Sequence, residues 1–395
     1  MNFPEYVSFT LDRLESLGYS AYLVGGCVRD HIMGNTPNDY DITTNATPEQ
    51  IEECFSDVRT IDVGKKHGTI TLVLNDSVVE VTTYRIDGEY KDSRHPESVT
   101  FTDRIEDDLS RRDFTVNAIA YSPQRGFVDP FGGRKDIESG IIRCVGIPER
   151  RFGEDALRIL RALRFASRLG FCIEDSTSTA IHEKRELLLN IAMERIKAEF
   201  EGMISCCNFP EIYREYFDVF KTFIPTILKI DNNVLIRASD ISSNVVLCSL
   251  FSCYSDLLFL SDELKRLKFE NATSKNILTI LSCVRKYCDK CSDADIKKSV
   301  AEIGKACTRD MYYVLYCLSG DVKYMDAVKR FNELDKNEEW ITLKKLNVKG
   351  NEIIEALKIN PSDTGGILSC LLNDVIEGVT VNKKDALLKH AKKYI

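Results

Sequence analysis

The chain has 395 residues, of which 44% are hydrophobic and 29% charged, a balance typical of globular proteins with more than one domain. Its net charge of −8 argues against a broadly basic nucleic-acid binder, so a phosphate-backbone contact requires local basic surface. The N-terminus has no basic region followed by an apolar run, and the most apolar segment, 245–260, is interrupted by polar residues. These features argue against a secretory signal and a membrane span. The fourteen scattered cysteines then indicate reduced thiols, and we expect a cytoplasmic protein.

The first elements form a strand, a glycine turn and a helix. Apolar spacing predicts a helix over 5–17, and the apolar run 22–24 predicts a short buried strand. Gly25 and Gly26 follow this strand and allow a tight turn whose backbone N–H groups face an anion. A short helix is expected over 27–33.

An acidic pair follows this helix. The segment 39–42 reads as a second strand, and alternation along a strand puts Asp39 and Asp41 on the same side. Two adjacent carboxylates repel each other unless a cation lies between them, and such ligands suit Mg²⁺ together with substrate phosphates. A phosphate-cradling turn followed by an acidic pair is what nucleotidyl transfer requires.

The string GGCVRDHIMGNTPNDYDITT (25–44) closely resembles the first motif of the class II tRNA nucleotidyltransferases (CCA-adding enzymes) and of bacterial poly(A) polymerases. Both belong to the polymerase-beta-like nucleotidyltransferase superfamily. The combination of GGxVRD and DxDIxT at this spacing is specific, whereas DxD alone is common. The resemblance implies that Gly25, Gly26 and Arg29 bind the triphosphate.

The next segments predict a hairpin and a polar loop. Strands are expected over 69–74 and 78–84, and Glu80 lies among valines, where an unpartnered carboxylate is costly. Glu80 is either a third acidic residue facing the pair or an exposed edge position, and the resemblance of EVTTYR to the family favours the site. The polar stretch 86–102 predicts a mobile loop near the site, and the intact segment 87–97 favours full CCA addition, because CC-adding relatives tend to lack part of it.

Adjacent arginines mark the next motif. In RRDFTVNAIAY (111–121) they suggest triphosphate neutralisation, although an isolated RRD is usually a solvated turn. The string resembles the second family motif, which puts Arg112 on the nucleotide, Asp113 near the ribose and Asn117 close by. The string DPFGGRKD (129–136) resembles the family's hinge between catalytic head and helical neck.

From Gly153 onward the pattern is helical, with six arginines against two carboxylates between 150 and 168. The ordinary interpretation is a solvated face with Glu154–Arg158 and Asp155–Arg158 pairs. The functional one uses hydrogen-bond chemistry: arginine only donates and aspartate only accepts, so together they match cytosine and adenine and reject guanine and uracil.

The segment EDALR (154–158) matches the EDxxR motif of class II CCA-adding enzymes. This resemblance implies that Asp155 and Arg158 act as the template for the incoming base, and that Arg161 and Arg164 also contact the nucleotide. The string ERIKAE (194–199) resembles the family's ERIxxE motif, which we interpret as structural support.

The remainder is predicted to be helical, and its last part, from 341, carries nine lysines against six carboxylates and resembles the tail of Firmicute-type CCA-adding enzymes. We therefore predict an α+β protein with a nucleotidyltransferase head of mixed sheet and helices, followed by an all-α neck, body and tail. The expected domains are a catalytic head, a neck with the base-selecting motif, a body and a tRNA-binding tail, at 1–148, 149–205, 206–335 and 336–395.

The predicted function is template-independent addition of C, C and A to the 3′ end of tRNA from CTP and ATP. Asp39 and Asp41 are expected to hold two Mg²⁺ ions, and neither a membrane nor a protein partner is required. Alternatives are CC-only or A-only addition, a poly(A) polymerase, a non-catalytic tRNA-binding protein and a small-molecule nucleotidyltransferase. The intact acidic pair counts against a non-catalytic protein, and the long helical part counts against a small-molecule enzyme.

Overall fold

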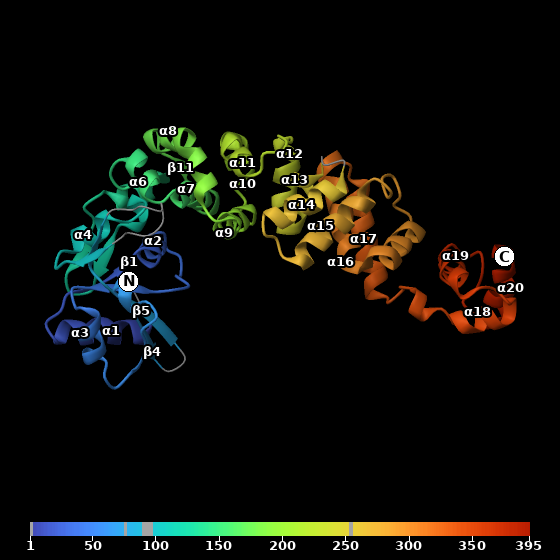
Figure 1. The fold of residues 1–395 in the computed structure, drawn as a ribbon, viewed down its shortest axis with the longest axis horizontal. Coiled ribbons are helices and arrows are strands. Elements are labelled where there is room, and N and C mark those ends of the chain that lie inside the picture. Colours follow the sequence, from blue (N-terminus) through green and yellow to red (C-terminus); the bar gives the residue numbers. More distant parts are fainter. Residues whose placement is uncertain (1–2, 75–76, 89–97, 253–255) are drawn as a thin grey trace. The chain divides into compact units, whose positions relative to one another are not determined.

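The computed structural model describes residues 3–74, 77–88, 98–252 and 256–395 (Figure 1). It forms two compact units, residues 1–226 and 227–395. The first unit combines a mixed sheet with helices and the second is helical, which confirms the α+β prediction. The finer division into head, neck, body and tail stays a prediction.

The sheet of the first unit has seven strands in the order β3-β4-β5-β2-β1-β8-β9. Only β2 and β5 pair in parallel, and the other neighbours are antiparallel. The strands are β1 (Ala21–Val24), β2 (Asp41–Thr44), β3 (Arg59–Ile61), β4 (Thr69–Leu74), β5 (Ser77–Thr83), β8 (Ala120–Ser122) and β9 (Gly126–Val128). Two further two-stranded sheets pair β6 (Arg85–Asp87) with β7 (Val99–Phe101) and β10 (Ile141–Ile142) with β11 (Cys172–Ile173).

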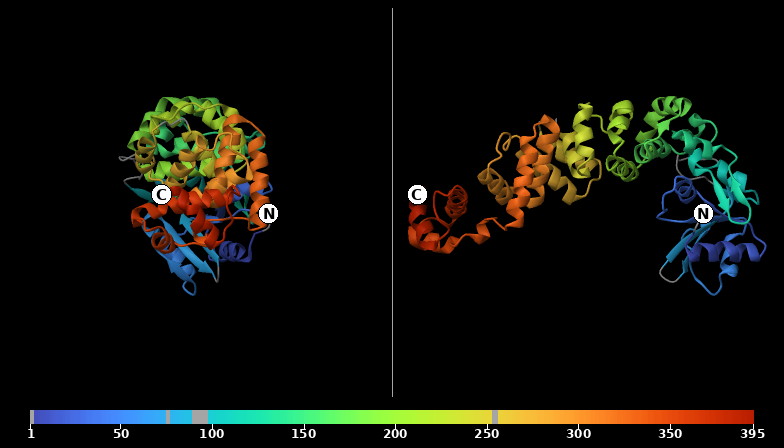
Figure 2. Two further views of the ribbon diagram at one scale, coloured as in Figure 1. Left: turned by 90° about the vertical axis from the view of Figure 1, so that its right-hand side faces the viewer. Right: turned by 180° about the vertical axis from the view of Figure 1, so that it is seen from behind.

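Helices α1 and α3 lie beside each other and contact the strands of this sheet (Figures 1 and 2). Helix α1 buries Val7, Leu11 and Leu14, as its spacing predicts, and α3 begins with a capping box between Thr47 and Gln50. The helices of this unit are α1 (Glu5–Ser16), α2 (Gly26–Ile32), α3 (Pro48–Cys54), α4 (Ile105–Ser110), α5 (Gly133–Ser139), α6 (Pro148–Glu154), α7 (Leu157–Leu169), α8 (Asp175–Lys184), α9 (Met193–Ile204), α10 (Phe209–Glu215) and α11 (Phe217–Phe223).

The second unit packs its helices around the long helix α16, which contacts α12, α13, α15 and α17. A smaller apolar cluster joins α18, α19 and α20. The helices are α12 (Asn232–Ser239), α13 (Ser243–Phe251), α14 (Leu257–Arg266), α15 (Asn271–Val284), α16 (Asp293–Ser319), α17 (Lys323–Lys336), α18 (Gly350–Leu357), α19 (Thr364–Ile376) and α20 (Lys384–Ala391). Short 3₁₀ helices over both units are η1 (Lys65–His67), η2 (Thr115–Asn117), η3 (Arg185–Asn190), η4 (Leu343–Lys345), η5 (Pro361–Asp363) and η6 (Lys392–Tyr394).

Three local predictions were wrong in detail. The second strand begins at Asp41 and not at Asp39, because Asp41 pairs with Val24, the last residue of β1, and earlier residues have no partner across. The expected loop over 86–102 has paired ends, β6 and β7, and its residues 89–97 lie outside the described part of the chain. The helix expected through Asp155 is broken there, since its backbone is extended (φ −140°, ψ 102°).

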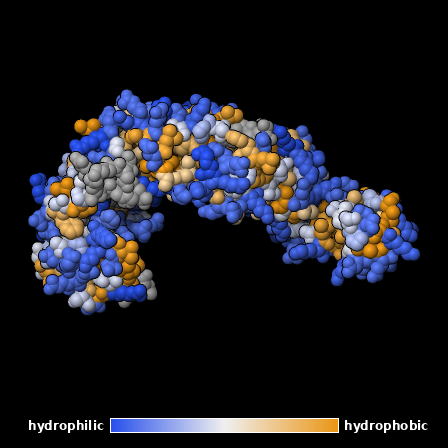
Figure 3. Space-filling view, viewed as in Figure 1, coloured by the Kyte–Doolittle hydropathy of each residue, from blue (hydrophilic) through white to orange (hydrophobic). Residues whose placement is uncertain are grey.

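The surface face in Figure 3 is predominantly hydrophilic. Within the described ranges, no helix is both long enough and apolar enough to cross a membrane. The described cysteines are free thiols, as the sequence predicts.

Candidate active site

Three carboxylates lie near one another at one end of the parallel strand pair. Asp41 on β2 lies directly beside Glu80 on β5, and Asp39 precedes Asp41 by two residues. Asp41 and Glu80 both stay exposed to solvent, but the protein around them displaces part of their water. This desolvation, and then the Asp41 and Asp39 charges, raise the pKa of Glu80. Desolvation and the Asp39 charge also raise the pKa of Asp41, although Arg112 opposes this. The structure therefore brings Glu80 to the acidic pair, as the sequence suggested, and the ionised cluster lacks full compensation.

The glycine turn approaches this cluster closely. Gly25 adopts φ +74°, and a Cβ there would lie 3.2 Å from Nη1 of Arg112 and 3.9 Å from Oδ2 of Asp41. Nε of Arg112 is buried and, within the described residues, has no hydrogen-bond partner. The backbone at Gly25, the Arg112 guanidinium and the Asp41 carboxylate thus lie close together, and we call this group the cradle.

Asp108, on α4, orients the arginine of the cradle. Its side chain is fully buried; Oδ1 accepts from Nε and Nη2 of Arg111 (3.0 and 2.7 Å), and Oδ2 accepts from Nη2 of Arg112 (3.1 Å). Burial alone would raise the pKa of Asp108, but the two guanidinium groups outweigh burial and hold that pKa below its ordinary value. No role was expected for Asp108, although its spacing of three and four residues from the arginines is a recognisable helical signal.

Four of the predicted nucleotide-binding residues form one hydrogen-bonded network, in which Arg29, Asp113 and Asn117 are buried and Arg161 is partly exposed. Arg29 is 3% exposed and donates from Nη1 to Oδ1 of Asn117 at 2.7 Å. Asn117 donates to Asp113 at 3.2 Å, and Asp113 accepts from Nε and Nη2 of Arg161 at 2.9 and 2.7 Å. Burial would raise the pKa of Asp113, but Arg161 outweighs it and holds the pKa below its ordinary value. In this conformation, Arg29 and Asp113 support the wall of the site.

Two residues missing from the predicted site extend this network. Glu199 on α9 accepts from Nε of Arg164 at 2.6 Å and lies 3.9 Å from Nη1 of Arg161. The guanidinium carbons of Arg29, Arg161 and Arg164 all lie within 5.4 Å of the Phe165 ring centre, as cation–π contacts. The contacts of Arg161 and Arg164 with Phe165 are local to α7, whereas those of Arg29 and Glu199 depend on how α2 and α9 pack against it.

The two residues expected to select the base do not pair with each other. Oδ2 of Asp155 lies 3.5 Å from Nη2 of Arg195, and Oδ1 accepts from the backbone N–H of Leu157. Arg158, which is 8% exposed, donates to Oε2 of Glu154 at 2.9 Å and to the carbonyl oxygen of Arg111 at 3.1 Å. The Glu154–Arg158 pair expected from helical spacing is confirmed and the Asp155–Arg158 pair was wrong, because the helix breaks at Asp155.

The residues of the cradle fit a divalent cation with a phosphate. Among the described residues, no three His, Cys, Asp or Glu side chains lie close enough together to hold a metal ion by themselves. Mg²⁺, however, usually takes only one or two protein carboxylates and completes its shell with water and substrate phosphates. A cation would relieve the repulsion between Asp39 and Asp41. A phosphate would match the guanidinium of Arg112, whose Nε has no partner among the described residues.

Comparisons with known proteins agree with this arrangement. Residues 21–143 match the family profile described as "Poly A polymerase head domain", and residues 170–227 match "Probable RNA and SrmB- binding site of polymerase A". The chain is 32% identical over 403 residues to the CCA-adding enzyme of Ligilactobacillus salivarius, covering 98% of this chain and 95% of that one. It is 49% identical to the CCA-adding enzyme of Geobacillus stearothermophilus over 49% of this chain and 48% of the relative.

Among solved structures, the fold is similar to that of the Bacillus stearothermophilus CCA-adding enzyme in complex with CTP, with a TM-score of 0.81 and 27% identity. That similarity covers 100% of this chain and 98% of the other. The Thermotoga maritima CCA-adding enzyme complexed with tRNA has the same fold at a TM-score of 0.72 and 20% identity, over 100% of this chain and 96% of that one.

Proposed function

The chain belongs to the family of CCA-adding enzymes, and on that premise we propose that it adds C, C and A in succession to the 3′ end of tRNA, using CTP and ATP and releasing pyrophosphate. The observation that carries this proposal is the cradle, where Asp41, Glu80 and Arg112 meet at the glycine turn. A turn that admits phosphate next to paired carboxylates suits attack of a hydroxyl group on an α-phosphate.

Asp39 and Asp41 would hold Mg²⁺, and the cradle would receive the triphosphate at Gly25, Gly26 and Arg112. When bound, Mg²⁺ supplies positive charge that steadies the attacked phosphate and the departing pyrophosphate. Glu80 has a raised pKa and lies beside Asp41, so it is suited to accept the proton of the attacking 3′-hydroxyl group. Arg112, held by Asp108, keeps donors directed at the triphosphate.

Base selection would use Asp155 and Arg158. Aspartate accepts from the amino group of cytosine or adenine, and arginine donates to the neighbouring ring atoms. The 3.5 Å separation between Asp155 and Arg195 is long for an ion pair, so Asp155 can exchange that contact for a base. Arg158 donates from Nη1 to Glu154 and to the Arg151 carbonyl, and from Nη2 to the Arg111 carbonyl. These three bonds use three of its five N–H donors, which leaves donors for a base.

The test is incorporation of labelled CTP into a tRNA transcript that lacks its CCA end, with Mg²⁺ present. We expect labelled tRNA and one pyrophosphate released per nucleotide, and neither with the Asp41→Asn variant. Growth of long A tracts from ATP would identify a poly(A) polymerase instead. Binding of the tRNA without incorporation would favour a non-catalytic binding protein, and transfer to small acceptors alone would exclude the tRNA function.

A further inference from the structure

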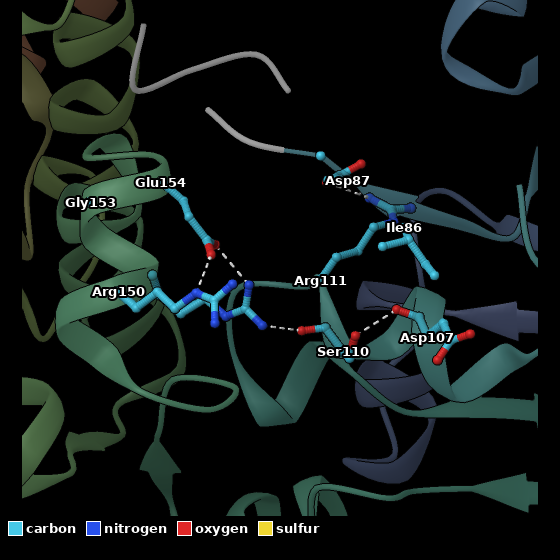
Figure 4. Close-up of a pocket in the computed structure, with 10 residues that line it drawn as sticks. Ile86, Asp87, Asp107, Ser110, Arg111, Arg150, Gly153 and Glu154 are labelled. Carbon is cyan, nitrogen blue, oxygen red and sulfur yellow. Dashed lines mark hydrogen bonds and ion pairs between the residues drawn. The ribbon is translucent and has the colours of Figure 1, made fainter. Parts of the chain in front are cut away.

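A pocket of about 620 Å³ lies between the end of α4, strand β6 and helix α6, and the function proposed above does not use it (Figure 4). Its charged lining consists of three arginines and three carboxylates: Arg111, Arg150, Arg151, Asp87, Asp107 and Glu154. The pocket adjoins the cradle through Asp108, which holds Arg111 of the pocket with one oxygen and Arg112 of the cradle with the other.

Two of the three arginines are occupied by the protein. Arg151 donates to the Val145 carbonyl at 2.8 Å, to Glu154 at 2.7 Å and to the Ser110 carbonyl. Arg111 is bonded to Asp108 through Nε and Nη2. These two side chains shape the pocket wall, but most of their donors are already used.

Arg150 differs from these two. Its side chain is 79% exposed, and its one ion pair joins Nε to Glu154 at 3.3 Å. Within the described parts of the chain, neither of its Nη groups has a hydrogen-bond partner. The pocket therefore has balanced charges overall and one cation with donors to spare. This is too little positive charge for a triphosphate, but it matches the single charge of one phosphodiester.

The transfer reaction needs two substrates side by side, and the cradle takes only one of them. An RNA strand presents one anionic phosphate per nucleotide, together with hydroxyl and amino donors. The pocket offers Arg150 to the phosphate and the Asp107 carboxylate, whose Oδ2 accepts from Thr102, to the donors. The Glu154 carboxylate and the Ser110 carbonyl already accept from arginines. We propose that this pocket binds the last nucleotides of the RNA chain, with Arg150 on one of their phosphodiesters. This inference rests on the proposed function.

The test compares Arg150→Ala with Arg104→Ala, an equally accessible arginine of the same unit (71% exposed) that lies outside the pocket. Loss of one partly solvated phosphate contact should raise the KM for tRNA about three- to tenfold and lower the salt-dependence slope of tRNA binding by about 0.7. The KM for CTP and the kcat at saturating tRNA should stay unchanged, and Arg104→Ala should resemble the wild type.

A neutral methylphosphonate at one of the last three linkages of the tRNA transcript locates the contact. At one position it should raise the KM of the wild type by the same factor and have no further effect on Arg150→Ala. Additive effects at all three positions would overturn the inference, as would an unchanged tRNA KM in the variant or a parallel rise in the KM for CTP. If the wild type incorporates no nucleotide, the proposed function itself fails.

Discussion

Replacing Asp108 by asparagine tests how the cradle is held in place. Asp108 is fully buried and its carboxylate carries three hydrogen bonds from two arginines, of 3.0, 2.7 and 3.1 Å. Asparagine keeps one acceptor but presents an amide N–H₂ group to the other guanidinium. Removing one partner of a buried ion pair costs about 3–5 kcal/mol, and we expect the lower end, because Arg111 and Arg112 remain 18% and 19% exposed.

A loss of about 3 kcal/mol should lower the Tm of a unit of this size by about 6–12 °C, measured by calorimetry or scanning fluorimetry. Arg112 then loses its anchor, and we expect the KM for CTP to rise about tenfold, which corresponds to about 1.4 kcal/mol. The control is Glu106→Gln on the same helix, because Glu106 is exposed and its one ion pair, with Arg104, is 3.9 Å long.

The pH dependence of stability tests the direction of the Asp108 pKa shift. The folded pKa of Asp108 is lowered, so its contribution to the free energy of unfolding is present above the unfolded pKa and is lost as pH falls through the folded one. The stability difference between wild type and Asp108→Asn should therefore be constant above about pH 5 and shrink below about pH 4. An unchanged Tm, or a difference that grows as pH falls, would refute the reasoning.

Three further predictions follow from the cradle and the break before α7. Asp41→Asn should abolish incorporation and keep tRNA binding. Its Tm at neutral pH should be equal to that of the wild type or higher, because desolvation and Asp39 disfavour the Asp41 charge. Mg²⁺ should raise the Tm of the wild type only. Gly25→Ala and Gly34→Ala both place alanine at positive φ and should each cost about 1–2 kcal/mol of stability. Only Gly25→Ala fills the cradle beside Arg112, so it alone should raise the KM for CTP; equal kinetic effects would contradict this. Asp155→Ala should loosen base choice, and an unchanged preference for CTP and ATP over GTP and UTP in single-nucleotide assays would remove Asp155 from that role.

The parts of the site that the sequence predicts are those fixed by local rules. Gly25 has the positive φ expected of a tight turn, and Glu80 lies beside the acidic pair, the alternative that the resemblance of EVTTYR favoured. The start of the second strand was missed because it depends on where β1 ends, which is a property of the pairing and not of residues 39–42.

The side of the site formed by α7 and α9 depends on tertiary packing. Arg161 reaches Asp113 across 48 residues, and Arg164 reaches Glu199 across 35, so no spacing rule predicts either pair. The break at Asp155 was missed because the apolar period continues on both sides of it. Asp108 is the opposite case, since its spacing from Arg111 and Arg112 already contains the signal.

The central claim is that one site adds C, C and A in order and then stops. The most direct measurement gives the purified protein three tRNA transcripts, ending before CCA, after C and after CC, each with CTP alone, ATP alone or both, and sizes the products on a gel. We expect stepwise growth of every transcript to a CCA end and arrest there. Arrest at CC with both nucleotides present, or extension of the CC-ended transcript only, would contradict it.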